Sequence, residues 1–390
     1  MDIFKIKGVV KDYSWGNADF IPSLIGGYDA KPQAELWFGT HKLGPSVTED
    51  GVLLGDLVRS DRSILGDDII SRFGGDVPLL FKVLAISSPL SLQCHPDKKQ
   101  AEDGWKREEE ARQKGLEVNY MDDNEKPEII AALTPVTAMC GFRSICDISE
   151  SLSSVIPETY NRILKPFSED ARSLFFRLYA LSDDDRNSIL EELAGNTSSA
   201  ECDSGFKSPA AIASECLRLY PGDIGALFPF IMNIINLNPG EALFMGPDIL
   251  HAYVYGNGVE LMAASDNVLR GGLTTKRMDL DELSRIMLFT AGPVGKARMY
   301  RDESGLTAYD SPSPAFRLLE GDTGTYRISD HRFMLALVIS GSAEFRLGGE
   351  TLRLSKGECA VVPHSVSDYE IEINGKAFFA EVPHAADQDR

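Results

Sequence analysis

Pro239-Gly-Glu-Ala-Leu-Phe-Met-Gly-Pro-Asp-Ile-Leu-His251 is the stretch that decides the fold, because a second stretch repeats its order of features. Lys356-Gly-Glu-Cys-Ala-Val-Val-Pro-His-Ser-Val-Ser367 aligns with it after one residue of slip. Both contain a glycine turn, a strand, a proline and a second strand. In small antiparallel barrels a hairpin enters and leaves the wall in this way, so the repeat predicts two related β-barrels. Ser367 aligns with His251, which indicates that only the first barrel kept a ligand at this place.

Strand signals extend outward from both stretches. Short apolar runs broken by Gly, Pro and Asp cover residues 4–142, 228–273 and 316–382. A connection rich in Pro, Gly and Ser separates the last two segments. The pattern therefore predicts a mainly β protein with a boundary near residue 300.

Helical spacing interrupts the strand pattern at about 148–224. Ser168 and Ser182 are placed to cap two helices there, and apolar residues recur behind each at helical intervals. Gly195 is placed to end the second helix. Two shorter helices are predicted at 98–114 and 279–289. The sequence thus predicts a helical segment inserted between two strand-rich regions.

We therefore predict three domains. A discontinuous β domain takes residues 1–147 and 225–300, a helical insertion takes residues 148–224, and a degenerate second β domain takes residues 301–390. A chain of 390 residues has enough material for two or three domains and a large core. Its hydrophobic fraction of 43% and charged fraction of 25% are ordinary for a globular protein.

The charge balance argues against polyanionic partners. Lys and Arg total 39 against 59 Asp and Glu, which gives a formal net charge of -20. Such a field repels nucleic acid and anionic membrane surfaces. It also repels an anionic metabolite, so a phosphorylated substrate requires a local cluster of cations that overcomes the global sign.

The cysteines favour a reducing compartment. They are scattered, with no CxxC pair and no dense framework, which is typical of free thiols. The six are Cys94, Cys140, Cys146, Cys202, Cys216 and Cys359. The first sixteen residues offer no continuous apolar region for export, and no later run approaches ~18 apolar residues. We therefore expect a cytoplasmic protein.

The strongest chemical signal is a set of four potential metal ligands. Residues two apart in a strand face the same side, so Gln93 and His95 are expected to point together into the barrel. Glu128 follows a Lys-Pro entry to a strand, and His251 ends the hairpin quoted above. Two imidazoles, one carboxylate and one amide oxygen suit a divalent ion with an open position for water or substrate. Zinc, one per chain, is the first candidate, and manganese, iron and cobalt remain open.

Several further stretches, which occur in this order, carry a family resemblance. They are Tyr13-Ser-Trp-Gly, Ala34-Glu-Leu-Trp-Phe-Gly-Thr-His41, Ser91-Leu-Gln-Cys-His-Pro-Asp-Lys98, Lys126-Pro-Glu128, Cys140-Gly-Phe-Arg143 and Gly258-Val-Glu-Leu-Met-Ala-Ala-Ser-Asp-Asn-Val-Leu-Arg270-Gly-Gly-Leu-Thr274. The chain resembles the type I mannose-6-phosphate isomerases of the cupin superfamily, strongly over residues 1–290 and loosely beyond. The two predicted barrels then become cupin-type jelly rolls.

The resemblance implies a reaction and a set of site residues. It implies interconversion of mannose 6-phosphate and fructose 6-phosphate through an enediol, in a monomer that binds a hexose phosphate. By position, Gln93, His95, Glu128 and His251 match the family's zinc ligands. Arg270 matches its catalytic arginine, and Ser91, Lys82 and Lys276 match positions associated with the sugar phosphate. Such enzymes feed mannose into glycolysis or draw fructose 6-phosphate toward GDP-mannose, and the sequence leaves the direction open.

The groups that move protons are less clear. The reaction needs a cation for the developing oxyanion and a base for the carbon-bound proton. Arg270 is our candidate for the cation. Asp266 is preferred as the base, with Glu260 and Lys126 as alternatives. Four residues on the recognised stretches, Trp15, Glu35, Trp37 and His41, are assigned to packing or support rather than catalysis.

Lys82 stands out among the predicted phosphate contacts. It interrupts the apolar run Leu79-Leu-Phe-Lys-Val-Leu-Ala85, and a charge in a buried strand normally has a partner or a function.

Two other functions remain as alternatives. Two His and a carboxylate also suit an iron-dependent cupin dioxygenase, and a non-catalytic cupin could bind sugar phosphates without turning them over.

Overall fold

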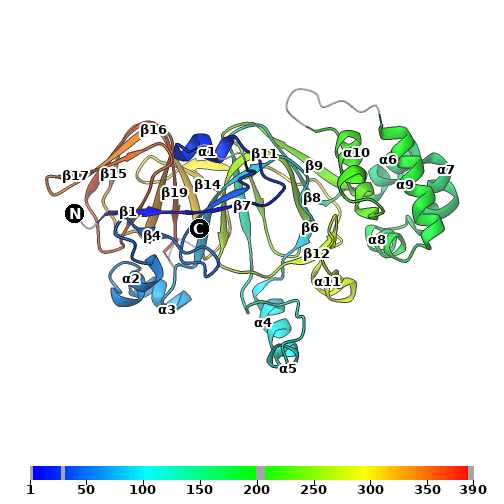
Figure 1. The fold of residues 1–390 in the computed structure, drawn as a ribbon, viewed down its shortest axis with the longest axis horizontal. Coiled ribbons are helices and arrows are strands. Elements are labelled where there is room, and N and C mark those ends of the chain that lie inside the picture. The colour runs from blue at the N-terminus through cyan, green and yellow to red at the C-terminus, as the bar shows by residue number, and fades with distance from the viewer. Residues whose placement is uncertain (1–2, 28–30, 199–206, 385–390) are drawn as a thin grey trace.

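The computed structural model describes residues 3–27, 31–198 and 207–384. Figure 1 shows an elongated molecule, with the C-terminal strands at one end, a group of helices at the other and the remaining strands between them. The protein is mainly β with added helices, as its sequence predicted. Across the described ranges, no helix combines the length and apolar character needed to cross a lipid bilayer.

A long central strand organises the first sheet. β11 (His251–Ala263) pairs near its start with β6 (Leu92–Cys94) and β8 (Val136–Phe142). After an irregularity between Tyr253 and Tyr255 it pairs with β5 (Leu79–Ile86) and β7 (Glu128–Ala132). The sheet also contains β2 (Val9–Lys11), β3 (Glu35–Phe38), β9 (Met232–Leu237), β10 (Ala242–Met245) and β12 (Leu269–Gly272). β11 thereby brings segments that are distant in sequence next to one another.

The second sheet is built mostly from the C-terminal part of the chain. It contains β13 (Met299–Arg301), β14 (Thr307–Tyr309), β15 (Arg317–Ile328), β16 (Met334–Leu347), β17 (Glu350–Ser355), β18 (Cys359–Val362) and β19 (Tyr369–Glu381). β1 (Phe4–Lys7) pairs with β18, and β4 (Val47–Thr48) pairs with β1. These two strands depart from the predicted placement of residues 1–147 in the first domain, because the pattern of a strand does not reveal which sheet edge it joins.

The two sheets share an apolar core. Phe81 of β5 belongs to the same fully buried cluster as Phe333, beside β16, and Phe378 of β19. Burial of one large apolar side chain contributes about 1.5–3 kcal/mol. The shared cluster therefore fixes the second sheet against the first.

The helices gather at the opposite end of the first sheet. They are α6 (Ile145–Val155), α7 (Pro157–Thr159), a π-helical turn (Tyr160–Leu164), a 3₁₀ turn (Lys165–Phe167), α8 (Ala171–Tyr179), α9 (Asp183–Thr197), α10 (Pro209–Leu219) and a 3₁₀ segment (Ile224–Phe230). Phe175 of α8 and Phe228 share a buried cluster with Leu92 of β6. The helical region thus packs behind the strands that carry the predicted site.

Six shorter helices lie outside this region: α1 (Phe20–Ile25), α2 (Leu54–Ser60), α3 (Asp67–Phe73), α4 (Lys98–Arg107), α5 (Glu109–Gln113) and α11 (Leu280–Ile286). Two predicted helix boundaries are wrong. The helix assigned to a Ser168 cap begins at Ala171, where the Asp170 carboxylate accepts from the Ser173 N–H. α9 starts after Ser182 as predicted but continues through Gly195. Asp caps as well as Ser, and one Gly costs a helix only about 1 kcal/mol, so neither signal fixes a boundary alone.

The sequence repeat recurs in the structure as the same order of turns and strands. Gly240 precedes β10 and Gly357 precedes β18, with φ of 87° and 83°. β11 and β19 then each run for 13 residues. However, β19 begins at Tyr369, so Tyr369 rather than Ser367 holds the place of His251. The sequence alignment had matched the two prolines, whereas the loops that follow them differ in length.

Candidate metal centre and active site

Strand register places three predicted site residues side by side. His251 of β11 pairs with Gln93 of β6, and Gln93 pairs with Arg270 of β12. Directly paired residues of antiparallel strands project their side chains to the same face. The structure therefore gathers these residues from three segments of the chain onto one side of the sheet.

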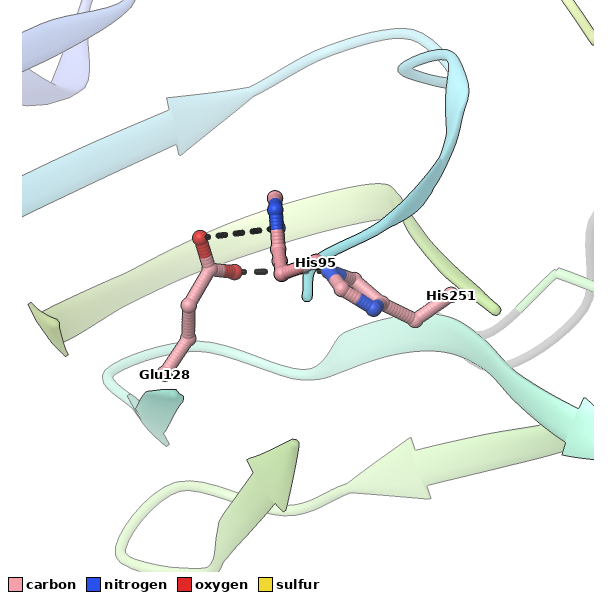
Figure 2. A group of neighbouring side chains, drawn as sticks. All are labelled: His95, Glu128 and His251. Atoms are coloured by element: carbon pink, nitrogen blue, oxygen red, sulfur yellow. Dashed lines mark ion pairs between the residues drawn. The ribbon is translucent and has the colours of Figure 1, made fainter. Parts of the chain in front are cut away.

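His95, Glu128 and His251 converge on one point (Figure 2). Nε2 of His95 lies 3.3 Å from Oε1 of Glu128, and Nε2 of His251 lies 3.4 Å from Oε2. One ligand atom from each residue lies within 4.8 Å of the other two, and all three residues are buried. Three of the four predicted ligands thus meet although they lie on distant parts of the chain.

Each imidazole presents a lone pair to this point. Nδ1 of His95 lies 2.7 Å from the Asn267 carbonyl oxygen, and Nδ1 of His251 lies 2.9 Å from that of Ile249. A carbonyl can only accept, so each Nδ1 donates and each neutral ring keeps its lone pair on Nε2. Among the described residues, the buried Nε2 of His95 has no hydrogen-bond partner. Two lone pairs that face one carboxylate fit a divalent cation.

Lys126 sets the charge state of the cluster. Its Nζ lies 2.9 Å from Oε1 of Glu128. Burial alone would raise the pKa of Glu128, but the charge of Lys126 holds that pKa well below its ordinary value. Burial and the Lys126 charge lower the pKa of His95 to about 4, so its ring is neutral at pH 7. The site therefore presents an ionised carboxylate and a neutral His95, the forms that bind metals.

Gln93 is the fourth predicted ligand, and strand pairing with His251 places it beside the cluster. Its amide nitrogen lies 3.4 Å from Oγ of Ser91 and donates to it. The donor set present, two imidazole nitrogens with one carboxylate and one amide oxygen, suits zinc and other borderline divalent ions.

Lys82 makes a buried ion pair instead of facing open space. It pairs directly with Glu260 across β5 and β11, with Nζ 2.8 Å from Oε2, and Glu35 lies 3.7 Å away. Burial would lower the pKa of Lys82, but the two carboxylates raise it above its ordinary value. Its positive charge is neutralised inside the protein, which argues against the predicted contact with a phosphate.

A cleft of about 400 Å³ holds the other predicted cations. Arg270, Lys276 and Arg277 line it together with Asp266, whereas Lys82 and Ser91 do not. Arg270 is half-buried, which lowers its pKa, and it makes no ion pair with any residue of the described ranges. The structure thus places Arg270 and Lys276 in one cleft, and neither Lys82 nor Ser91 is among the residues that line it.

Two side chains, His41 and Lys42, contact the carboxylate of Asp266. Its carboxylate lies 2.9 Å from Nε2 of His41 and 3.2 Å from Nζ of Lys42. The hydrogen bond from His41 lowers the pKa of Asp266 to about 2, which makes it a weak base. His41 therefore supports Asp266, a residue that lines the cleft.

Sequence reasoning also missed a group of polar residues behind the site. Asn267 is fully buried, and its side chain binds the backbone of residues 121–124. The available signal was the Ser265-Asp-Asn267 motif itself, which had been used only as evidence of family. A buried Asn indicates a hydrogen-bond network, because an isolated amide is costly to bury.

Comparisons with known proteins agree with this geometry. The profile of the type I phosphomannose isomerase catalytic domain matches residues 3–145, and that of the mannose-6-phosphate isomerase cupin domain matches residues 321–382. The mannose-6-phosphate isomerase of Escherichia coli K12 is 33% identical over 388 residues, covering 95% of this chain and 97% of the relative. Mannose-6-phosphate isomerase 1 of Arabidopsis thaliana is 31% identical over 408 residues, covering 96% and 91%.

Solved structures give the same result. A crystal structure of a mutant phosphomannose isomerase from Salmonella typhimurium superposes with a TM-score of 0.88 at 30% identity. It covers 98% of this chain and 100% of that one. A crystal structure of mannose 6-phosphate isomerase bound with zinc and yttrium matches with the same TM-score and coverage.

Proposed function

This chain belongs to the type I phosphomannose isomerase family, and we propose that its buried His–Glu–His cluster and the adjoining cleft interconvert mannose 6-phosphate and fructose 6-phosphate. The single observation that carries this assignment is the convergence of His95, Glu128 and His251 beside the unpaired Arg270. A metal-holding interior next to an unneutralised cation is what an aldose–ketose isomerisation through an enediol requires.

Zinc is the metal we propose for the cluster. His95, Glu128, His251 and the amide oxygen of Gln93 would hold it, and the match to a zinc-bound isomerase structure supports the choice. When bound, such an ion acts as a Lewis acid toward a carbonyl or hydroxyl oxygen. The chain's own groups supply binding, charge stabilisation and proton transfer.

Lys276 is our candidate for binding the phosphate. It lines the cleft and makes no ion pair with the described part of the chain, whereas its neighbour Arg277 is paired with Asp279 at 3.1 Å. A free ammonium in this cleft meets the requirement, set by the net charge of -20, for a local cation. Anchoring the phosphate fixes the reacting carbons of the sugar. Contact between Ser91 and the phosphate stays a prediction.

Arg270 is our candidate for stabilising the enediolate. Because this half-buried guanidinium has no carboxylate partner in the described ranges, its positive charge is available to stabilise negative charge on a bound substrate. Proton transfer between C1 and C2 we assign to Glu260 rather than Asp266. Burial raises the pKa of Glu260, although its partner Lys82 opposes the change, so Glu260 is a stronger base than Asp266. Lys126 remains an alternative, because it faces the same interior through Glu128.

The same family membership disfavours the two alternative functions, an iron-dependent dioxygenase and a sugar-phosphate-binding protein without catalysis. Either would leave the proton-transfer groups without a role. Oxygen consumption by an iron-loaded sample would support the dioxygenase, and tight hexose phosphate binding without turnover would support the binding protein.

We also propose an architecture, an oligomeric state and a cellular setting for the protein. The two sheets form two cupin-type jelly-roll barrels, and the helical insertion packs on the first of them; β1 and β4 belong to the second. The protein works as a monomer in the cytoplasm and supplies either glycolysis or GDP-mannose synthesis. A single chain provides every group named above, and the five cysteines in the described ranges are all unpaired, which supports a reducing compartment. Cys202 lies outside the described residues.

A coupled assay tests the proposed function. Purified protein is supplied with mannose 6-phosphate, fructose 6-phosphate is measured, and the metal content is determined by elemental analysis. We expect turnover with about one zinc per chain. EDTA should abolish turnover while the far-ultraviolet circular dichroism changes little, because the large core does not depend on one ion. Full turnover after rigorous metal removal would refute the assignment.

A further inference from the structure

Asn267 lies directly behind the metal cluster. It is fully buried, and its backbone carbonyl accepts the hydrogen bond from Nδ1 of His95 at 2.7 Å. This bond fixes both the orientation of the imidazole and the nitrogen that keeps the lone pair. The placement of His95 therefore depends on the placement of the Asn267 backbone.

The side chain of Asn267 holds that backbone against a second loop. Nδ2 donates to the carbonyl oxygens of Asp122 at 2.9 Å and Asn124 at 2.8 Å. Oδ1 accepts from the backbone N–H groups of Met121 at 2.7 Å and Asp122 at 3.3 Å. Both amide donors and the amide oxygen are thus used. Only an amide offers two donors and an acceptor in this shape.

The Asp122 carboxylate closes the network from the other side. It accepts from the Ser265 hydroxyl at 2.8 Å and from the Asp266 N–H at 2.8 Å. The loops at 121–124 and 265–267 are therefore joined in both directions. The first loop continues directly into Lys126 and Glu128, so the network links His95 to the carboxylate it faces.

We propose that Asn267 is a positioning residue that holds His95 and Glu128 at the separation required for the metal. The inference rests on the metal centre of the proposed function. Without the amide, the 121–124 loop loses its main attachment, and Glu128 and the His95 ring are no longer held relative to one another. Losses of this kind typically weaken metal binding about 10–100-fold.

The test is Asn267→Asp, which keeps the shape of the side chain. The aspartate loses both donors and places a charged oxygen against two carbonyls. We expect the zinc dissociation constant, measured by competition with a chromophoric chelator, to rise about 10–100-fold. An unchanged zinc affinity in a folded variant would overturn the proposal, and a lower melting temperature of the metal-free protein alone would assign Asn267 a purely structural role.

A matched control separates positioning from general destabilisation. Glu192 in α9 accepts from the backbone N–H groups of Glu158 and Thr159, so it is a comparable network far from the cluster. Glu192→Gln exchanges a carboxylate for an amide, the reverse of the test substitution. It should lower the melting temperature and leave zinc affinity within about twofold of wild type, well inside the change expected for Asn267→Asp. An equal loss of zinc affinity in this control would also overturn the proposal.

Asp122→Asn covers the case in which Asn267→Asp fails to fold. This milder change leaves Asn267 in place but weakens the contacts of residue 122 with Ser265 and Asp266. A several-fold loss of zinc affinity is expected, and an unchanged zinc affinity would contradict the proposal. The wild type distinguishes the two failures. If wild-type protein neither binds zinc nor isomerises mannose 6-phosphate, the proposed function fails; if it does both and the variants bind zinc normally, only the positioning role fails.

Discussion

The β10–β11 and β18–β19 segments have the same order of turn and strands but do not form hairpins, because β10 pairs with β7 and β18 with β1 and β16. They differ in the residue that opens the second strand. β11 opens with His251, which faces Glu128 in a polar interior. β19 opens with Tyr369, whose ring lies 6.4 Å from that of Phe345 in an apolar cluster. A candidate metal ligand at the start of β11 therefore corresponds to an aromatic packing residue at the start of β19.

The arginines of the two regions show the same contrast. Arg332 in the second region is buried and contacts Asp330 at 2.7 Å, Asp302 at 2.8 Å and Glu381 at 3.4 Å. Arg270 in the first region is half-buried without an ion pair in the described ranges. A fully paired buried arginine holds structure together, whereas an unpaired one retains its charge for a ligand.

The largest expected effect on activity comes from replacing, one at a time, the residues that open β11 and β19. His251→Ala removes a proposed metal ligand and should raise the activation free energy by about 4 kcal/mol, which lowers kcat roughly a thousand-fold. Tyr369→Phe removes a buried hydroxyl that has no hydrogen-bond partner, so kcat should be unchanged and stability equal or higher. The coupled assay and zinc analysis measure both. A comparable loss of activity in both variants would show that the two regions are not functionally distinct.

The two arginines give the next effect. Arg270→Ala should lower kcat about 100- to 1000-fold with KM changed only a few-fold, because the charge is needed most in the transition state. Arg332→Ala should instead reduce the free energy of unfolding by about 3–5 kcal/mol, since it leaves buried carboxylates unpaired. Steady-state kinetics and urea denaturation separate the two outcomes. Equal changes in kcat and KM for Arg270→Ala would indicate uniform binding rather than transition-state stabilisation.

The candidate metal ligands could be predicted from the sequence because their residue types and spacing are characteristic of metal sites. Gln93 and His95 lie two residues apart, and the carboxylate and second imidazole each follow a recognisable strand entry, so their convergence was predictable. Periodicity also indicated the mainly β fold and its helical region. These features depend on local signals or on motifs that are rare by chance.

What the sequence could not supply was pairing between distant segments. The contact between His41 and Asp266 spans 225 residues, and that between Lys82 and Glu260 spans 178. Each depends on which strand or loop becomes a neighbour, a property of register that neither partner encodes alone. Burial alone predicted that Lys82 has a partner or a function but could not name Glu260, and the phosphate contact was inferred from the family resemblance.

The turns before β10 and β18 test how closely the two segments correspond. Gly240 and Gly357 both have positive φ, so alanine is strained at either position. A Cβ on Gly357 would lie 2.3 Å from the Leu24 carbonyl oxygen, whereas nothing lies within 4 Å of one on Gly240. We expect Gly240→Ala to cost about 1 kcal/mol of unfolding free energy and Gly357→Ala about 3 kcal/mol. Equal costs from urea denaturation would show that backbone strain alone determines both.

The smallest expected effect concerns acid stability at the rim of the catalytic cleft. The pKa of Asp266 in the folded protein, about 2, lies below its ordinary value near 4, so folding favours the ionised carboxylate. Its contribution is complete above pH 4 and is lost as the pH falls toward 2. Because the group is partly exposed, we expect roughly 1 kcal/mol. Urea denaturation of metal-free wild type and Asp266→Asn at pH 5 and pH 3 measures it. The variant should be less stable at pH 5, and the difference should shrink at pH 3; a difference that grows on acidification would contradict the lowered pKa.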